Sequence, residues 1–251
     1  MTKTPIISVI IPAYRCEATI ADAIESALRQ DIDLEILVVN NDKNNKALSS
    51  LLHSYNDKEN VFIFDNEKNL GAAKGRNLGV KLARGRYIAF LDADDMWTEG
   101  KLKEQLTLLV QSNAPICCTA RELIKPDGSK TGRVIPVNSK ISYRELLSHN
   151  SINCSSVLLS KEIALEFPME HEEAHEDYIT WLKIVKKYGA AVGINKPMLL
   201  YRLSNTGKSG SKLQSAKMTY RVYRYAGYNT ISASLLFLRY AVHGVLKYLF
   251  A

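Results

Sequence analysis

The first 111 residues alternate four times between short runs of branched apolar residues and longer amphipathic segments. The short runs predict buried strands, and the apolar spacing of the longer segments predicts helices. The expected strands are residues 6–11, 34–39, 61–64 and 86–91, and the expected helices are residues 19–28, 47–55, 71–83 and 100–111. This alternation is typical of an α/β protein with a Rossmann-like, mostly parallel sheet flanked by helices.

The pattern is less regular after Pro115, but no linker or repeat divides the chain. We expect further strands at residues 116–119, 155–159 and 198–203 and a helix at residues 178–187. Composition agrees with a globular fold: 46% of the residues are hydrophobic and 24% are charged, which excludes a disordered, collagenous or wholly coiled-coil chain. The four cysteines show no C-x-x-C spacing, so we expect buried thiols in a reducing compartment.

Polar residues follow three of the predicted strands, at residues 12–15, 40–42 and 92–95. Ligands of open α/β sheets bind at the carboxyl ends of strands, so these residues are candidates for a site. Asp92, Asp94 and Asp95 are costly to bury together unless a cation neutralises them, and Mg²⁺ or Mn²⁺ would suit their oxygen ligands. The alternative is a solvated acidic turn in which Asp95 caps the next helix.

Taken together, these motifs resemble those of the family 2 glycosyltransferases, which have a GT-A fold. The matching stretches are residues 8–14, 35–39, 69–79, 85–95, 175–178 and 201–202. Each stretch alone is weakly diagnostic, but their order and spacing over residues 6–205 are specific. The resemblance implies an inverting, metal-dependent enzyme that transfers a hexose from a UDP-sugar. It also implies a GT-A catalytic domain over residues 1–210, followed by a basic amphipathic helical tail over residues 211–251.

The resemblance also implies roles for individual residues. Donor-side roles fall on Pro12, Ala13 and Tyr14 (uridine pocket), Arg76 (base or diphosphate), Asp92 (ribose), Asp94 (Mn²⁺ or Mg²⁺) and Arg202 or Lys208 (diphosphate). Asp177 would be the general base, preceded by Glu176. Asn40 and Asn41 replace the Asp-rich turn that usually reads the uracil, and the Asn41 amide can still donate and accept hydrogen bonds there.

The net charge of +7 belongs to the end of the chain, because residues 201–251 contain eight Lys or Arg and no Asp or Glu. Residues 231–250 are too interrupted to span a bilayer. Arg239, His243 and Lys247 share one helical face, opposite an apolar stripe of Leu235, Leu238, Val242, Val245 and Leu249. This arrangement favours a helix lying on an anionic membrane over nucleic-acid binding; packing on the domain or on a homodimer partner is the alternative.

Family members often extend sugars on undecaprenyl diphosphate at the cytoplasmic face of the cell membrane. The resemblance therefore implies a lipid-linked saccharide acceptor in O-antigen or capsule biosynthesis and a cytoplasmic, peripheral location at the inner face of that membrane. No nucleic-acid partner is expected.

Two other functions are open at this point. Residues 171–175 match the H-E-x-x-H pattern, so a zinc-dependent hydrolase using His171 and His175 is one of them. A non-catalytic sugar-nucleotide fold that acts as an assembly partner is the other, motivated by Asn40 and Asn41. Trp97 could stack on a sugar or simply pack. Residues 207–209 resemble part of a phosphate-binding loop but lack its first glycine, since position 202 is Arg202.

Overall fold

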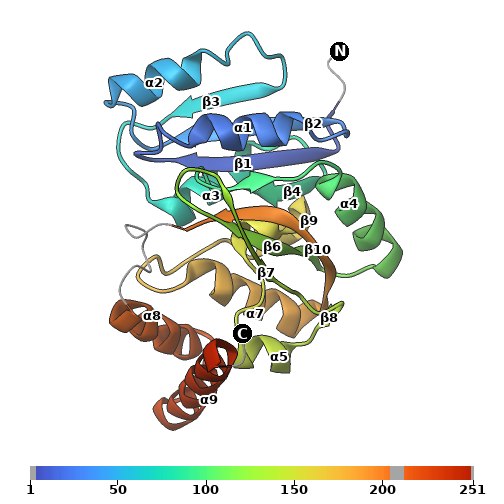
Figure 1. Cartoon of the computed structure of the whole chain (residues 1–251), viewed down its shortest axis with the longest axis vertical. Coiled ribbons are helices and arrows are strands. Elements are labelled where there is room, and N and C mark those ends of the chain that lie inside the picture. Colours follow the sequence, from blue (N-terminus) through green and yellow to red (C-terminus); the bar gives the residue numbers. More distant parts are fainter. Residues whose placement is uncertain (1–3, 204–211, 250–251) are drawn as a thin grey trace.

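The computed structural model describes residues 4–203 and 212–249 (Figure 1). The elements are, in chain order, β1 (Ile7–Ala13), α1 (Ile20–Leu28), β2 (Leu34–Asn40), α2 (Lys46–His53), β3 (Val61–Asp65), α3 (Ala72–Leu82), β4 (Tyr87–Phe90), β5 (Met96–Trp97), α4 (Lys101–Ser112), β6 (Ile116–Ile124), β7 (Lys130–Ile135), β8 (Lys140–Ile141), α5 (Tyr143–Ser148), the 3₁₀ turn η1 (Cys154–Ser156), β9 (Leu158–Ser160), α6 (Lys161–Glu166), α7 (Glu176–Tyr188), β10 (Ala191–Arg202), α8 (Lys212–Tyr225) and α9 (Thr230–Leu249).

The strands of the described residues form one sheet, in which eight follow the order β3-β2-β1-β4-β9-β6-β10-β5. Strands β3, β2, β1 and β4 are parallel, as expected from the N-terminal alternation. Strand β9 lies antiparallel between β4 and β6, while β6 and β10 are parallel. The predicted α/β architecture is confirmed, and each antiparallel pair includes at least one strand that follows Pro115 in the chain.

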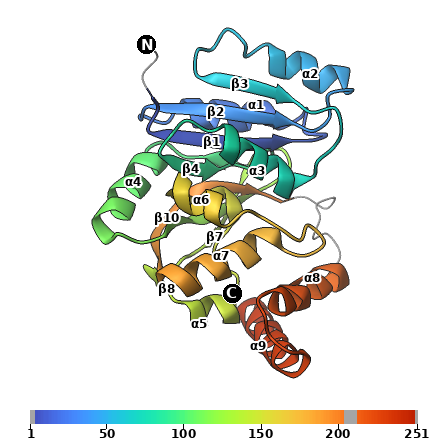
Figure 2. The same cartoon turned by 180° about the vertical axis from the view of Figure 1, so that it is seen from behind.

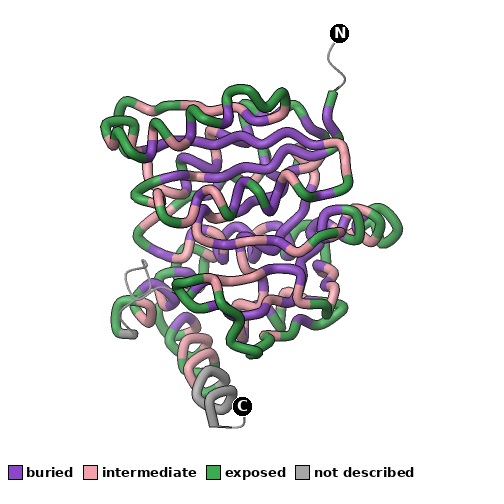
Figure 3. Tube along the Cα trace, turned by 45° about the horizontal axis from the view of Figure 1, so that its top comes forward, coloured by how far each residue is buried: buried purple, intermediate pink, exposed green. Residues whose placement is uncertain are grey.

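Helices cover both faces of the sheet, and the central strands are buried on both sides (Figures 2 and 3). Side chains alternate along β1, so that Ile7, Val9 and Ile11 pack with α1, α2 and α4, while Ile10 packs with α3 and α7. This double burial explains why the first strands read as continuous apolar runs. Cys117, Cys118 and Cys154 are buried free thiols in these layers, and Cys16 is partly buried.

Strand β1 continues through Pro12, two residues further than expected, because only one neighbour is still paired there. It pairs with β2 as far as Ala13 but with β4 only as far as Ile10. The Asn41 N–H donates to the Ala13 carbonyl and the Leu91 N–H to the Ile10 carbonyl, so alternate residues of β1 face β2 and β4. The nitrogen of Pro12 therefore faces the side on which β4 has ended, and no ladder bond is lost.

Three expected elements of the second half differ from the structure. Residues 154–156 form the turn η1 instead of strand, because the Asn153 side chain accepts from the Ser155 N–H and caps the turn. Strand β6 extends through the polar residue Glu122, which pairs with Lys130 of β7 at 2.9 Å. Strand β10 begins at Ala191 and passes Pro197 with shifts of register that hide its periodicity.

Helices α8 and α9 follow the sheet and pack against α7 and α5 at one end of the molecule (Figure 1). Buried Tyr223 fixes α8, and its hydroxyl donates to the Leu147 carbonyl at 2.8 Å. The apolar stripe of α9 is uncovered in part, because Leu235 and Leu238 are 65% and 61% exposed. Within the described ranges, none of the helices combines the length and the apolar character needed to span a bilayer.

Some residues singled out in the sequence are not described by the structure. Lys208 and the rest of residues 207–209 lie outside the described residues. The side chains of His243, Val245, Lys247 and Leu249 also lie outside them.

Candidate active site

The Asp-rich segment after β4 forms a tight turn. The Asp95 N–H donates to the Asp92 carbonyl at 3.1 Å, and the Asp92 N–H donates to Oγ of the buried Ser155 at 3.1 Å. Asp95 is itself buried and accepts from the backbone N–H of Arg202 at 3.0 Å. The suggestion that Asp95 caps the next helix is wrong, since Gly100 is the N-cap residue of α4.

Arg202, at the end of β10, fastens this turn to the rest of the domain. Its Nε donates to the Asp94 carbonyl at 2.8 Å, Nη1 to the Pro126 carbonyl at 2.7 Å and Nη2 to the Asp22 carboxylate at 3.0 Å. The guanidinium is nearly buried, at 6% exposure of the side chain. In the structure, Arg202 thus fixes the backbone that carries Asp94. Contact between Arg202 and a diphosphate stays a prediction.

The carboxylates of the turn are held in an electrostatically unfavourable arrangement. Burial raises the pKa of Asp94 to about 6, and the nearby Asp92 charge adds to the effect. Burial also raises the pKa of Asp95, together with the charges of Asp94 and Asp92. A divalent cation would relieve this repulsion, so the donor set suits Mg²⁺ or Mn²⁺.

Protein ligands alone do not complete such a metal site. In the part of the chain that the structure describes, no group of three or more His, Cys, Asp or Glu residues is arranged to hold a metal ion. A cation at Asp94 would therefore need oxygens from a bound diphosphate and from water, as is common for Mg²⁺.

Asp177 lies in the first turn of α7, where its carboxylate accepts from the Tyr178 N–H at 2.8 Å. Burial, with a smaller contribution from the Glu176 charge, raises the pKa of Asp177 to about 7 even though Arg76 opposes the shift. A carboxylate with this pKa is suited to accept a proton near neutral pH.

Arg76 of α3 joins the Asp-rich turn to the start of α7. It donates to Asp92 Oδ1 at 2.5 Å and to Glu176 Oε1 at 3.1 Å, and its side chain is 7% exposed. The charges of Arg76 and Asp92 act on both Asp94 and Asp177. The two carboxylates singled out in the sequence, Asp94 and Asp177, therefore belong to one electrostatic neighbourhood, although they are 83 positions apart in the numbering.

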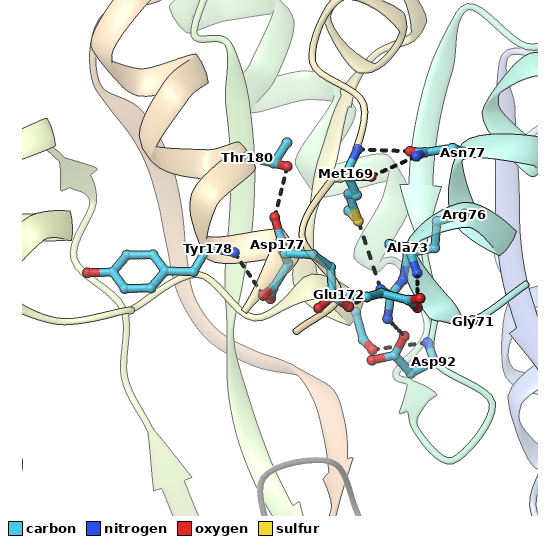
Figure 4. A network of polar contacts seen from close by, with 12 residues as sticks. Gly71, Ala73, Arg76, Asn77, Asp92, Met169, Glu172, Asp177, Tyr178 and Thr180 are labelled. Carbon is cyan, nitrogen blue, oxygen red and sulfur yellow. Dashed lines mark hydrogen bonds and ion pairs between the residues drawn. The ribbon is translucent and has the colours of Figure 1, made fainter. Parts of the chain in front are cut away.

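The loop that leads into α7 is fastened to α3, as Figure 4 shows. Asn77 donates to the Met169 carbonyl at 2.8 Å and accepts from the Met169 N–H at 2.9 Å. Glu172 accepts from the Ala73 N–H at 3.0 Å, at the N-terminus of α3. This contact of Glu172 was not predicted from the sequence, because the only motif that includes Glu172 is the H-E-x-x-H match, which indicates zinc binding.

That match does not form a zinc site. His171 has a left-handed backbone with φ of 65°, residues 172–174 form a turn, and α7 begins only at Glu176. The two histidines are thus not one helical turn apart on a helix face, which a metalloprotease site requires. His171 instead stacks on the Tyr225 ring with 3.7 Å between centroids. The hydrolase alternative is therefore wrong.

The residues expected to bind uridine lie at the ends of β1 and β2. Tyr14 is 41% exposed and Ala13 is buried, with Pro12 between these extremes. Asn41 is buried, donates to the Gly71 carbonyl at 3.3 Å and accepts from Asn66 at 2.9 Å. Its amide therefore ties the sheet to the start of α3, and base recognition stays a prediction.

Trp97 packs inside the domain, so its ring is not available to stack on a sugar. It is 3% exposed, and its indole N–H donates to the Ser155 carbonyl at 2.7 Å. The buried Lys101 ammonium lies over the ring, 4.1 Å from its centroid. The packing alternative is confirmed for this residue.

The mixed, mostly parallel sheet with polar residues at the carboxyl ends of its strands is a GT-A-like fold, the class of fold that nucleotide-sugar transferases use, and comparison with known proteins identifies the family. The sequence model of Glycosyl transferase family 2 matches residues 8–165. The chain belongs to this family, and the protein is a glycosyltransferase.

Relatives match nearly the whole chain. TuaG of Bacillus subtilis, named for teichuronic acid biosynthesis, is 31% identical over 97% of both proteins. WfgD of Escherichia coli, named a UDP-Glc:α-D-GlcNAc-diphosphoundecaprenol β-1,3-glucosyltransferase, is 32% identical over 98% of this chain and 96% of its own.

Solved structures share the fold at low sequence identity. Staphylococcus aureus TarS residues 1–349 with UDP-GlcNAc has a TM-score of 0.72 at 17% identity, covering 94% of this chain and 71% of that one. The Pyrobaculum calidifontis mannosyltransferase PcManGT, solved with GDP-Man and Mn²⁺, has a TM-score of 0.66 at 17% identity over 90% and 65%.

Proposed function

We propose that this protein transfers a hexose from a UDP-sugar to a saccharide carried on undecaprenyl diphosphate, with inversion at the anomeric carbon. The WfgD name gives both substrate classes for a relative that aligns along nearly its whole length. The observation that carries the proposal is the junction at Arg76, where the Asp-rich turn after β4 meets the first turn of α7.

The reaction is a single displacement. The acceptor hydroxyl attacks the anomeric carbon, the bond from that carbon to the diphosphate oxygen breaks, and UDP leaves. Asp177 takes the proton of the hydroxyl as the new bond forms. Its raised pKa of about 7 makes it a stronger base than an exposed carboxylate, while it is still largely ionised in mildly alkaline solution. Glu176 adjusts this basicity and anchors Arg76.

The donor lies, in this proposal, along the carboxyl ends of β1, β2 and β4. Pro12, Ala13 and Tyr14 contact the uridine, with Asn41 near the base and Asp92 at the ribose. Arg76 and Arg202 supply positive charge near the diphosphate. Asp94 would hold Mg²⁺ or Mn²⁺, and a cation bound there supplies stabilisation of the charge on the departing diphosphate.

Residues 1–210 form the catalytic domain in this proposal, and residues 211–251 face the lipid. The exposed apolar residues of α9, Ile231, Leu235, Leu238 and Val242, would enter the interface of an anionic membrane, placing the enzyme peripherally at the inner face of the cell membrane. Deleting residues 231–251 is expected to weaken binding to phosphatidylglycerol vesicles at low salt. If the truncated enzyme binds these vesicles as well as the full-length enzyme does, residues 231–251 are not the membrane-binding segment.

The test of the base is Asp177→Asn, which removes the proton acceptor but keeps the size of the side chain. We expect kcat to fall by roughly 10²–10⁴-fold, the usual contribution of a general base. UDP affinity, measured by calorimetry with Mn²⁺ present, should stay within about twofold of wild type. A parallel loss of UDP binding would show that Asp177 supports the donor site instead.

Asp94→Asn is the matched variant on the donor side. It is expected to weaken UDP binding in Mn²⁺ but to change UDP binding in EDTA little, since the carboxylate acts through the cation. Equal affinity for UDP with and without Mn²⁺ in the wild type would contradict this assignment. Transfer assays with a panel of donors then identify the sugar, and absence of both transfer and donor hydrolysis in Mn²⁺ would favour the non-catalytic alternative.

A further inference from the structure

An open groove of about 410 Å³ lies between α8 and α9, and the proposed reaction assigns it no role. The lining residues are Leu213, Ala216, Lys217, Tyr220 and Arg221 of α8 and Phe237 of α9. The Tyr220 and Phe237 rings meet edge to face with 6.4 Å between centroids and join the two helices. The groove surface is apolar, so Lys217 and Arg221 line it with their methylene stems and carry their charges beyond it.

The charged residues that line the groove are both basic. Lys217 and Arg221 are four residues apart and therefore share a face of α8. None of the lining residues is acidic, and residues 201–251 contain no Asp or Glu at all. An occupant with a long apolar part and an anionic group would match both the walls and the rim.

The cationic side of the groove contacts the loop that leads into α7, the helix that carries the proposed base. Arg221 Nη1 donates to the Glu173 carbonyl at 2.9 Å. The Tyr225 hydroxyl, one turn further along α8, donates to the Glu173 carboxylate. Glu173 lies four residues before Asp177 in the chain. A ligand whose anionic group sits near Arg221 would thus be directed toward the acceptor side of the active site.

We propose that this groove binds the prenyl chain of the acceptor, with the acceptor diphosphate beside Lys217 and Arg221. The inference rests on the proposed function, because it assigns a place to the lipid part of that acceptor. A bilayer surface is a poorer occupant, since the exposed stripe of α9 already offers an outward apolar face. A second copy is also a poorer occupant, because six lining residues fall far short of the roughly 20–30 that a stable interface uses on each side.

The experiment compares two soluble acceptors that share a GlcNAc-diphosphate head, one with an undecyl chain and one with an ethyl group. Ala216→Trp fills the groove, and Gln214→Trp places the same side chain at an exposed position on α8 that does not line it. For Ala216→Trp we expect the KM of the undecyl acceptor to rise about tenfold, the effect of losing roughly two buried methylene groups. The KM of the ethyl acceptor and of the donor, and all constants of Gln214→Trp, should stay near wild type.

Several results would overturn the proposal. An equal effect of Ala216→Trp on both acceptors, or no wild-type preference for the longer chain, would do so while leaving the transferase function intact. Transfer to neither acceptor by the wild type would count against the proposed function instead. Binding of the alkyl chain in the groove would then be tested by photolabelling with a diazirine on that chain. Labels found outside residues 212–242 would refute the proposed binding site.

Two further measurements separate folding and membrane effects from chain binding. Phosphatidylglycerol vesicles without acceptor should bind wild type and Ala216→Trp equally, and selective loss for the variant would identify the groove as a membrane contact instead. If Ala216→Trp fails to fold, Lys217→Gln replaces it, with an expected rise in KM for both diphosphate acceptors. An unchanged KM for Lys217→Gln would refute the placement of the acceptor diphosphate beside Lys217.

Discussion

Arg76→Met tests whether one guanidinium holds the two halves of the active site together. Methionine keeps an apolar stem of similar length but removes the charge that Asp92 and Glu176 share. Those two side chains are 30% and 9% exposed, and Arg76 is 7% exposed. The variant therefore leaves one buried and one partly exposed carboxylate without their cation.

The structure sets the size of the effect. Removing one partner of a fully buried ion pair costs roughly 3–5 kcal/mol. Asp92 is about one-third exposed and is stabilised by water, so we expect the lower end, about 3 kcal/mol. In a protein of this size 1 kcal/mol corresponds to about 2–4 °C, which predicts a fall in Tm of roughly 6–12 °C. Lys103→Met, which breaks an exposed pair with Asp31, is the control and should change stability by less than about 1 kcal/mol.

The pH profile of kcat/KM is the second readout. Asp177 acts as base only when it is deprotonated, so kcat/KM should rise with pH through its pKa of about 7. Arg76 opposes the increase in that pKa, so its removal should move the rise to higher pH. Adding Glu176→Gln to Arg76→Met should restore part of the lost stability, because it removes a buried carboxylate that has lost its ion pair with Arg76. A Tm within 2 °C of wild type, or a double variant no more stable than Arg76→Met, would refute this account of the junction.

Two other substitutions test nearby packing. Gly71→Ala should destabilise the protein by roughly 1–3 kcal/mol, because Gly71 has φ of 80° and an added Cβ would lie 2.1 Å from the Glu172 carboxylate. The cost should be smaller in a Glu172→Ala background, and an equal cost there in urea unfolding would contradict the clash. Burial lowers the pKa of Lys101 to about 7, so the unfolded chain keeps that proton to higher pH and wild-type stability should rise between about pH 7 and 10.5. Lys101→Met should lack this rise in urea unfolding, and parallel pH curves for the two proteins would contradict the lowered pKa of Lys101.

Local pattern predicted the first half of the sheet because burial on both faces makes a strand apolar at every position. The full lengths of β6 and β10 were not predicted. Glu122 is tolerated in β6 because it forms an ion pair with Lys130 on a neighbouring strand, and Pro197 is tolerated in β10 because the register shifts there. Both compensations depend on contacts with other strands, so the sequence of the strand itself does not predict them. The turn η1 is a different case, because its cap is local: Asn153 accepts from the Ser155 N–H, next to residues with strand-like composition.

The candidate site shows the same limit. The Asp cluster and Asp177 were found through motifs, but the partners of Arg76 are 16 and 100 positions away and only the fold brings them together. Arg202 and Asn41 illustrate a second limit. Both were expected to face a ligand, whereas the structure gives most of their hydrogen bonds to the protein backbone and to neighbouring polar side chains.

The proline near the end of β1 has a consequence for the open edge of the sheet. Strand β4 stops at Phe90, while β1 runs on beside β2 to Ala13. An extended segment pairing with β1 on the side where β4 has ended would find no N–H at Pro12. Pro12 therefore disfavours the addition of a further strand at the carboxyl end of β1, beside the candidate site.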